Sequence, residues 1–209
     1  MTDNRQYAPA TQRNREAILE ILLQVLPPQG NVLEIASGTG EHSIFFAPHL
    51  QPRQWIPSDP NPLAIASIID WQNQFPVDNL TKPLTLDITA PDWSSSYHLQ
   101  NQNIQMLVNI NMIHISPWVA CVGLITGTKN ILPLGGILYL YGPFKQDGQH
   151  TSISNAEFDA SLRSQNLDWG VRNLEDVVAL AASQNLKLLN VCSMPANNLS
   201  VVFQKEIIK

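Results

Sequence analysis

Short apolar runs alternate with amphipathic segments along most of the chain. The runs at 31–36, 54–59, 83–89, 104–110 and 137–144 have the length and apolar content of buried strands. The segments between them carry apolar residues at helical spacing. Strands that alternate with helices form right-handed crossovers in a mostly parallel sheet. The pattern therefore predicts an α/β fold with a doubly wound sheet.

The boundaries of the expected helices come from residues that start or stop helices. Pro27, Pro28 and Gly30 end the first helix, and Pro117 suits the beginning of a later one. The stretch Ser154-Asn155-Ala156-Glu157 matches a capping box, which opens another helix. The helices are expected at 13–26, 41–48, 63–73 and 117–132, followed by one from Ser154 and one from Asn173.

Two further apolar runs, 186–194 and 197–207, close the chain. The segment between them is short, so they are expected to pair as an antiparallel hairpin. The prediction is a single domain over residues 1–209 with a seven-stranded, mostly parallel sheet and an antiparallel C-terminal hairpin. Residues 1–12 are polar and aperiodic, and they form a separate N-terminal segment.

Composition and charge narrow the class of partner. The 209 residues are 44% hydrophobic, which suits one domain with a sizeable core. The net charge is −5 and no Lys/Arg run exists, so a nucleic-acid partner is disfavoured. The N-terminus has no apolar signal core, and no stretch reaches the ~18 consecutive apolar residues of a membrane span. We expect a cytoplasmic protein that does not enter a membrane.

Cysteine and histidine usage gives no sign of a metal centre. Cys121 and Cys192 lie in apolar contexts and are expected to be reduced core thiols. The five histidines are scattered without the spacing of metal ligands. No metal is therefore expected.

The stretch ASGTG, residues 36–40, follows the first strand and precedes a helix. Glycine permits a positive φ and a close approach of the backbone to a ligand, and the helix N-terminus attracts anionic groups. The dinucleotide fingerprint G-x-G-x-x-G would require glycine at position 43, but Ser43 stands there, and Glu41 opposes a pyrophosphate at the helix start. These departures count against a nicotinamide cofactor.

Three acidic residues are expected at the same edge of the sheet. Glu34 lies near the end of the first strand, Asp59 ends the second, and Asp87 ends the third. An acid about 20 residues after the glycines can accept hydrogen bonds from ribose hydroxyls. Acids around a glycine turn suit a nucleoside with a cationic tail, and S-adenosylmethionine is such a molecule.

The motif E-x-A-S-G-T-G resembles the first motif of class I S-adenosylmethionine-dependent methyltransferases, (D/E)-x-G-x-G-x-G. Ala36 replaces the first glycine, which we take as a mild departure because alanine is the next smallest residue. More closely, the chain is similar to the domain-of-unknown-function 938 family, described as methyltransferase-like. The matching stretches are QRNREAILEIL, VLEIASGTGEHS, INMIHISPW, LYLYGPFK, SNAEFDASLR, WGVRN and MPANNLSVVF.

The resemblance implies a class I methyltransferase fold and a site at the ends of the first five strands. The residues expected to hold the cofactor are Glu34, Ala36, Ser37, Gly38, Gly40, Asp59, Asp87, Asn109 and Arg13. His114, Asn111 and Tyr141 are expected to face the methyl acceptor, with His114 as a general base or an orienting group. Residues 3–15 are expected to form a lid, with Arg13 or Asn14 reaching into the site.

The function that these residues favour is S-adenosylmethionine-dependent methyl transfer to a small molecule. One alternative is a protein that binds S-adenosylmethionine or S-adenosylhomocysteine without catalysis, since the expected site residues include no acid–base pair. A nicotinamide-dependent oxidoreductase is a further alternative. The Asn/Asp-Pro-Pro-aromatic motif of amide and adenine amino-group methyltransferases is missing, since the fourth strand continues as Asn109-Ile110-Asn111-Met112.

Overall fold

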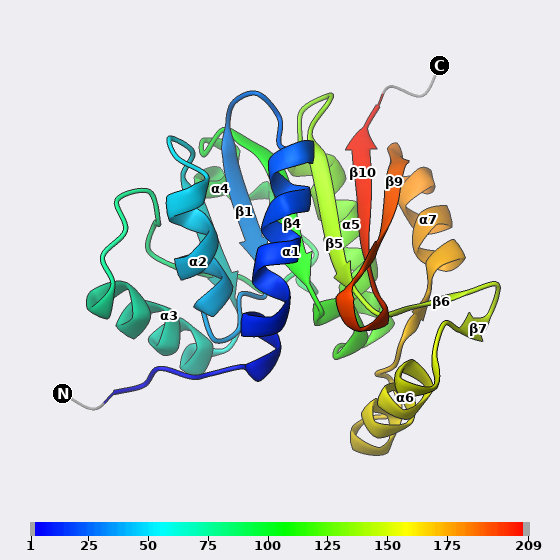
Figure 1. The fold of residues 1–209 in the computed structure, drawn as a ribbon. Coiled ribbons are helices and arrows are strands. Elements are labelled where there is room, and N and C mark those ends of the chain that lie inside the picture. The colour runs from blue at the N-terminus through cyan, green and yellow to red at the C-terminus, as the bar shows by residue number, and fades with distance from the viewer. Residues whose placement is uncertain (1–2, 207–209) are drawn as a thin grey trace.

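A seven-stranded sheet forms the centre of the molecule (Figure 1). The structure is a computed structural model and describes residues 3–206. The strands of this sheet lie in the order β3-β2-β1-β4-β5-β10-β9. Their bounds are β1 Asn31–Ile35, β2 Trp55–Asp59, β3 Leu84–Thr85, β4 Ile104–Ile110, β5 Ile137–Gly142, β9 Leu186–Met194 and β10 Asn198–Lys205.

The pairing of the strands confirms the predicted fold class. Strands β3, β2, β1, β4 and β5 are parallel to one another, whereas β10 is antiparallel to both β5 and β9. The two C-terminal strands thus form the expected antiparallel hairpin. Strand β10 lies inside the sheet, between β5 and β9, and not at its edge.

Helices cover both faces of the sheet, because the central strands are apolar on both sides. On β1, Val32 belongs to a core with the first helices of the chain, and Leu33 belongs to the opposite core with later ones. Helices α1 and α2 cover one face, and α5 and α7 cover the other (Figure 1). The helices are α1 Pro9–Val25, α2 Glu41–His49, α3 Pro62–Gln74, α4 Tyr97–Gln100, α5 Trp118–Ile131, α6 Ile153–Gln165 and α7 Leu174–Ser183.

Two predicted boundaries were wrong. Helix α1 begins at Pro9, before the first apolar-periodic residue, because proline is well suited to the first turn. Helix α6 is not opened by the predicted capping box at Ser154 and Glu157. Its N-cap is Ser152, whose side chain accepts a hydrogen bond from the backbone N–H of Asn155.

The chain between β5 and α7, here called the insertion, contains the predicted helix α6 and three short strands that the sequence pattern did not predict. Strands β6 Phe144–Gln146, β7 Gln149–His150 and β8 Arg172–Asn173 form a small second sheet beside α6. The carboxylate of Asp159 in α6 lies within 3.2 Å of Lys145 Nζ and 3.3 Å of both His150 Nε2 and Arg163 Nε. It also accepts a hydrogen bond from the backbone N–H of Val171 at 2.7 Å, and so joins the parts of the insertion.

Candidate functional site

The carboxyl ends of β1, β2, β4 and β5 meet at one edge of the sheet, in the lower part of Figure 1. Ligands of open α/β sheets bind at this edge, beyond the point where the strand order reverses. Here the reversal lies between β1 and β4, which are neighbours although β2 and β3 come between them in the chain. The glycine turn, residues 36–40, leaves β1 at this point.

The two glycines of the glycine turn serve different purposes. Both have a positive φ, +56° at Gly38 and +85° at Gly40. A Cβ atom at Gly38 would point into open space, with no heavy atom within 4 Å. A Cβ atom at Gly40 would lie 2.9 Å from Cγ1 of Ile68 in α3. Gly38 therefore leaves room on the ligand side of the turn, while Gly40 allows α3 to pack closely against it.

Ala36 also has a positive φ, +56°. The replacement of glycine by Ala36 therefore affects the backbone conformation and not only the size of the side chain. The position requires a left-handed backbone, which costs a residue with a Cβ roughly 1–2 kcal/mol. Glycine would avoid this strain, which the chain accepts at Ala36.

We expect Ala36→Gly to stabilise the protein. Relief of the left-handed strain is partly offset by the greater freedom of glycine in the unfolded chain, leaving a gain of about 0.5–1 kcal/mol. Thermal unfolding measured by calorimetry should show a rise in Tm of about 2 °C. A fall in Tm would mean that the contacts of the Ala36 methyl group outweigh the backbone strain.

Glu34 lies beneath the glycine turn and is only 2% exposed. Its Oε2 accepts hydrogen bonds from Trp55 Nε1, at 2.9 Å, and from the hydroxyl of Ser43. Burial raises the pKa of the Glu34 carboxyl, because the charged form loses its hydration. In this structure Glu34 supports the turn from below, and its direct contact with a ligand stays a prediction.

Asp59 and Ser37 tie the glycine turn to the end of β2. Asp59 Oδ2 accepts a hydrogen bond from the backbone N–H of Gly38 at 3.0 Å, and Oδ1 accepts one from Asn61. The hydroxyl of Ser37 accepts a hydrogen bond from the backbone N–H of Ser58. A carboxylate oxygen can accept more than one hydrogen bond. Asp59 therefore fixes the turn, and its contact with ribose hydroxyls stays a prediction.

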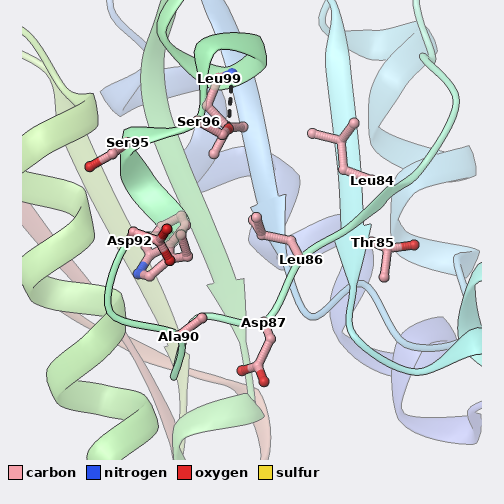
Figure 2. Close-up of a pocket in the computed structure, with 10 residues that line it drawn as sticks. Leu84, Thr85, Leu86, Asp87, Ala90, Asp92, Ser95, Ser96 and Leu99 are labelled. Carbon is pink, nitrogen blue, oxygen red and sulfur yellow. Dashed lines mark hydrogen bonds between the residues drawn. The ribbon is translucent and has the colours of Figure 1, made fainter.

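Asp87 lies beyond β3, which ends at Thr85 and is shorter than predicted. Its Oδ1 accepts hydrogen bonds from the backbone N–H and the hydroxyl of Thr89, and these lower the pKa of its carboxyl. Asp87, Leu86 and Asp92 are among the residues that line a cavity of about 480 Å³ (Figure 2). Asp87 is exposed and does not lie in contact with the glycine turn, so its role at an adenine ring stays a prediction.

Asn109 lies in β4 opposite Ile35, the last residue of β1. Its Nδ2 donates a hydrogen bond to the carbonyl of Ile35 at 3.0 Å, and the side chain is 1% exposed. Its Oδ1 is buried and has no hydrogen-bond partner within the described residues 3–206. A buried, unpaired acceptor costs free energy unless something donates to it. A contact between this atom and the cofactor stays a prediction.

Asn111 and His114, both expected at the acceptor, lie in different environments. Asn111 has a φ of +64° and faces a cavity described below. His114 is 0% exposed, and burial together with nearby Arg172 lowers the pKa of its imidazole to about 3. Its ring packs against Gly142 and Phe144 and does not line that cavity. The structure places His114 behind the wall of the site, and its role as a base stays a prediction.

Tyr141 lies near the end of β5, and side chains from both ends of the chain form hydrogen bonds with its hydroxyl group. Its hydroxyl oxygen accepts a hydrogen bond from Asn198 Nδ2 at 3.1 Å, and it also has Asn14 as a hydrogen-bond partner. Asn14 Oδ1 in turn lies 2.9 Å from Nε2 of His42 in α2. This connection links the helix after the glycine turn to the hydroxyl of Tyr141.

A cavity of about 790 Å³ lies beside Tyr141. We call it the edge cavity. Helix α1, the segment after β4, the end of β5, α6 and the β9–β10 hairpin all contribute to its wall. Its polar lining residues are Arg13, Asn14, Asn111, Tyr141, Ser154, Asn155 and Asn198, and its apolar ones are Ala10, Ile115, Pro143, Phe158, Pro195 and Ala196. Its size suits a small-molecule ligand.

The N-terminal segment lies against α3 and the glycine turn. The backbone N–H of Gln6 donates to Ser67 Oγ at 2.8 Å, and that hydroxyl donates to the carbonyl of Thr39 in the turn. The ring of Trp71 contacts Tyr7 edge-on. Residues 1 and 2 of the predicted segment lie outside the described residues. The described part packs beside the glycine turn, and its role as a lid stays a prediction.

The edge cavity unites some predicted residues and adds others. Asn111, Tyr141 and Arg13 line it together, whereas Gly38 and Asp59 lie at the glycine turn and Asp87 lies apart. Asn155 and Phe158 were missed because the sequence predicted their helix but not its position beside the edge cavity, although their stretch SNAEFDASLR belonged to the family resemblance.

A sequence profile of the family described as "Protein of unknown function (DUF938)" matches residues 5–205. The chain belongs to the DUF938 family. The match covers the glycine turn, the N-terminal segment from Arg5 onward and every residue of the edge cavity. The resemblance to this family is thereby confirmed.

Solved structures that share the fold of the DUF938 protein include methyltransferases. An O-methyltransferase family 2 protein from Planctomyces limnophilus, in complex with apigenin, matches with a TM-score of 0.79 at 16% identity, over 94% of this chain and 58% of that one. An O-methyltransferase family protein from Burkholderia thailandensis matches with a TM-score of 0.78 at 11% identity, over 96% and 58%. The DUF938 chain thus spans little more than half the length of these two proteins.

A third match has nearly the same length as the DUF938 protein. The N-methyltransferase NodS from Bradyrhizobium japonicum matches with a TM-score of 0.63 at 17% identity, over 95% of this chain and 98% of that one. At such identities the likeness shows a shared fold alone. Within residues 3–206, no helix is long and apolar enough to cross a membrane, and no group of three or more His, Cys, Asp or Glu side chains could hold a metal ion.

Proposed function

We propose that this DUF938 protein is an S-adenosylmethionine-dependent methyltransferase that acts on a small molecule. The observation that carries the proposal is the glycine turn, which is open at Gly38 and bound to the carboxylate of Asp59. The methyltransferase fold of its structural neighbours supports the same function. A protein of this kind is expected in the cytoplasm.

The residues at the turn fit the cofactor. Gly38 leaves room for close approach of the ligand, and Asp59 offers acceptor capacity for ribose hydroxyls. The unpaired Oδ1 of Asn109 can accept a hydrogen bond from the ligand's amino group. When bound, the cofactor supplies an electrophilic methyl group on a positively charged sulfur.

The protein's part in such a reaction is to position the two reactants. Methyl transfer is an in-line displacement, for which proximity and orientation supply much of the rate enhancement. An acceptor in the edge cavity would lie next to Asn111, which follows β4, and next to Tyr141 in β5, the strand that pairs with β4. Helix α1 closes one side of the cavity with Arg13 and Asn14.

Ligand-induced stabilisation tests the proposal. We expect S-adenosylmethionine and S-adenosylhomocysteine, at about 100 times their Kd, to stabilise the protein by about 2.7 kcal/mol and to raise Tm by several degrees. NAD and NADP at the same concentrations serve as controls and should leave Tm unchanged. A rise with NADP and none with S-adenosylhomocysteine would overturn the proposal in favour of an oxidoreductase.

A second candidate is a protein that binds the same cofactor without catalysis. It is favoured by one observation, that the lining of the edge cavity contains no carboxylate and no imidazole. Transfer of a labelled methyl group to any acceptor separates the two candidates, because both predict binding of S-adenosylhomocysteine and only one predicts turnover.

A further inference from the structure

The edge cavity contains a cation without a partner. The sequence has six arginines, and five of them have a partner. Three contact a carboxylate: Arg5 contacts Asp3, Arg15 contacts Glu16 and Arg163 contacts Asp159. Two donate to a backbone carbonyl: Arg53 to that of Pro27 and Arg172 to that of Ile113. Arg13 lines the cavity, and its guanidinium makes no hydrogen bond or ion pair with any residue in the described range 3–206. Arg13 is exposed, so its charge is open to a ligand that enters the cavity from solvent.

Tyr141 presents a second group suited to an anion. Its hydroxyl oxygen accepts a hydrogen bond from Asn198 Nδ2, and burial raises the pKa of the phenol, so the hydroxyl keeps its proton. Because the oxygen is the acceptor in that bond, the O–H of Tyr141 is left to donate elsewhere. The hydroxyl belongs to a residue that lines the edge cavity. Arg13 and Tyr141 thus offer two donors to the same space.

The rest of the lining has no group that could remove a proton. The thirteen lining residues include no aspartate, glutamate, histidine or lysine. A base is needed only when the acceptor must lose a proton during the reaction. An acceptor that enters as an anion needs none. Phe158 and Ile115 add apolar surface beside the polar groups, which suits an organic anion better than an inorganic one.

Resting on the proposed function, we infer that the methyl acceptor is a small organic acid, ionised at neutral pH, whose anionic group binds between Arg13 and Tyr141. Its anionic oxygen forms the new bond to the methyl carbon while the carbon–sulfur bond breaks. The electron pair of that bond stays on the sulfur, which becomes a neutral thioether. The product is a neutral ester or ether, so it loses its attraction to Arg13 and can leave the cavity.

The test measures binding of matched charged and neutral probes to the protein saturated with S-adenosylhomocysteine. Titration calorimetry with benzoate and hexanoate, against benzamide and hexanamide, separates charge from shape. We expect at least one carboxylate to bind about tenfold or more tightly than its amide, as a charge-assisted contact requires. If neither carboxylate binds, or if the amides bind equally well, the inference is overturned.

Variants of two arginines on the same helix identify the group responsible. Arg13→Gln should weaken carboxylate binding about tenfold and leave the affinity for S-adenosylhomocysteine unchanged. Arg15→Gln removes the same charge two residues away, where the guanidinium lies over the ring of Phe45, and should change neither. Loss of S-adenosylhomocysteine affinity in Arg13→Gln would assign Arg13 to the cofactor and overturn the inference. If the unaltered protein binds no S-adenosylhomocysteine, the proposed function itself fails.

Discussion

Replacing Gly38 with alanine is expected to weaken binding of S-adenosylhomocysteine about 100-fold or more. The new methyl group would project into the open space above the glycine turn, where no protein atom lies within 4 Å, and would occupy the place of the ligand. Because it meets no protein atom, the loss of stability should be limited to the cost of the left-handed backbone, about 1 kcal/mol. Titration calorimetry measures the affinity, and thermal unfolding measures the stability.

Gly40→Ala is the matched control in the same turn. Its Cβ atom would lie 2.9 Å from Ile68 Cγ1 and 3.0 Å from the Ile68 backbone Cα, so α3 would have to move. Overpacking and backbone strain together should cost about 2–4 kcal/mol of stability. The two variants are therefore expected to differ in kind. Gly38→Ala should lose affinity for S-adenosylhomocysteine, and Gly40→Ala should lose stability. A Gly38→Ala variant with normal affinity would show that no ligand approaches the turn.

The sequence predicted the sheet well because apolar runs and helical spacing report local structure directly. All seven strands of the main sheet lie where the pattern placed them. Strands β3 and β5 are shorter than predicted, and residue 207, at the end of the predicted last run, lies outside the described residues. The second sheet escaped because its strands have two or three residues, too few for any period. Its position depends on Asp159, whose contacts with Lys145, His150 and Arg163 join residues that are not adjacent in the sequence.

Within the site, the sequence could indicate residue types at the sheet edge but not their burial. Glu34, Asp59 and Asp87 form a similar series in the sequence, yet the structure places one beneath the turn, one against it and one in solvent. The depth of each carboxylate follows from neighbours such as Trp55 and Ser43, which contact Glu34 only after folding. Prediction of the edge cavity required the position of α6 relative to α1 and the β9–β10 hairpin, which the spacing of residues within a helix does not indicate.

His114 is expected to weaken the fold as the pH falls. Burial lowers the pKa of its imidazole from 6.5 to about 3, with Arg172 acting in the same direction and Asp159 opposing it. Below pH 6.5 the unfolded chain therefore takes up a proton that the folded protein does not, so the free energy of unfolding decreases. Between about pH 7 and pH 5 this single group should remove about 2 kcal/mol of stability.

The wild-type pH profile alone does not isolate this effect, because Glu34 acts with the opposite sign. Burial raises the pKa of its carboxyl, so the folded protein holds a proton that the unfolded chain releases, and stability from this group increases as the pH falls. Chemical denaturation at each pH gives the free energy of unfolding of the wild type and of His114→Gln. Glu34 and His42 are present in both proteins, so their contributions cancel in the difference between the two free energies. The variant should lose about 2 kcal/mol less than the wild type between about pH 7 and pH 5.

Glu34→Gln provides the test of opposite sign. The amide cannot take up the proton, so this variant should lose more stability than the wild type over the same fall in pH. The free energy of unfolding of His114→Gln and of the wild type could instead change equally with pH. That result would mean that the imidazole of His114 has the same pKa in the folded and the unfolded chain, and that it is not buried behind the edge cavity in solution. In that case an imidazole reachable by water at neutral pH would again be available to the acceptor, and the assignment of an acceptor that needs no base would lose its support.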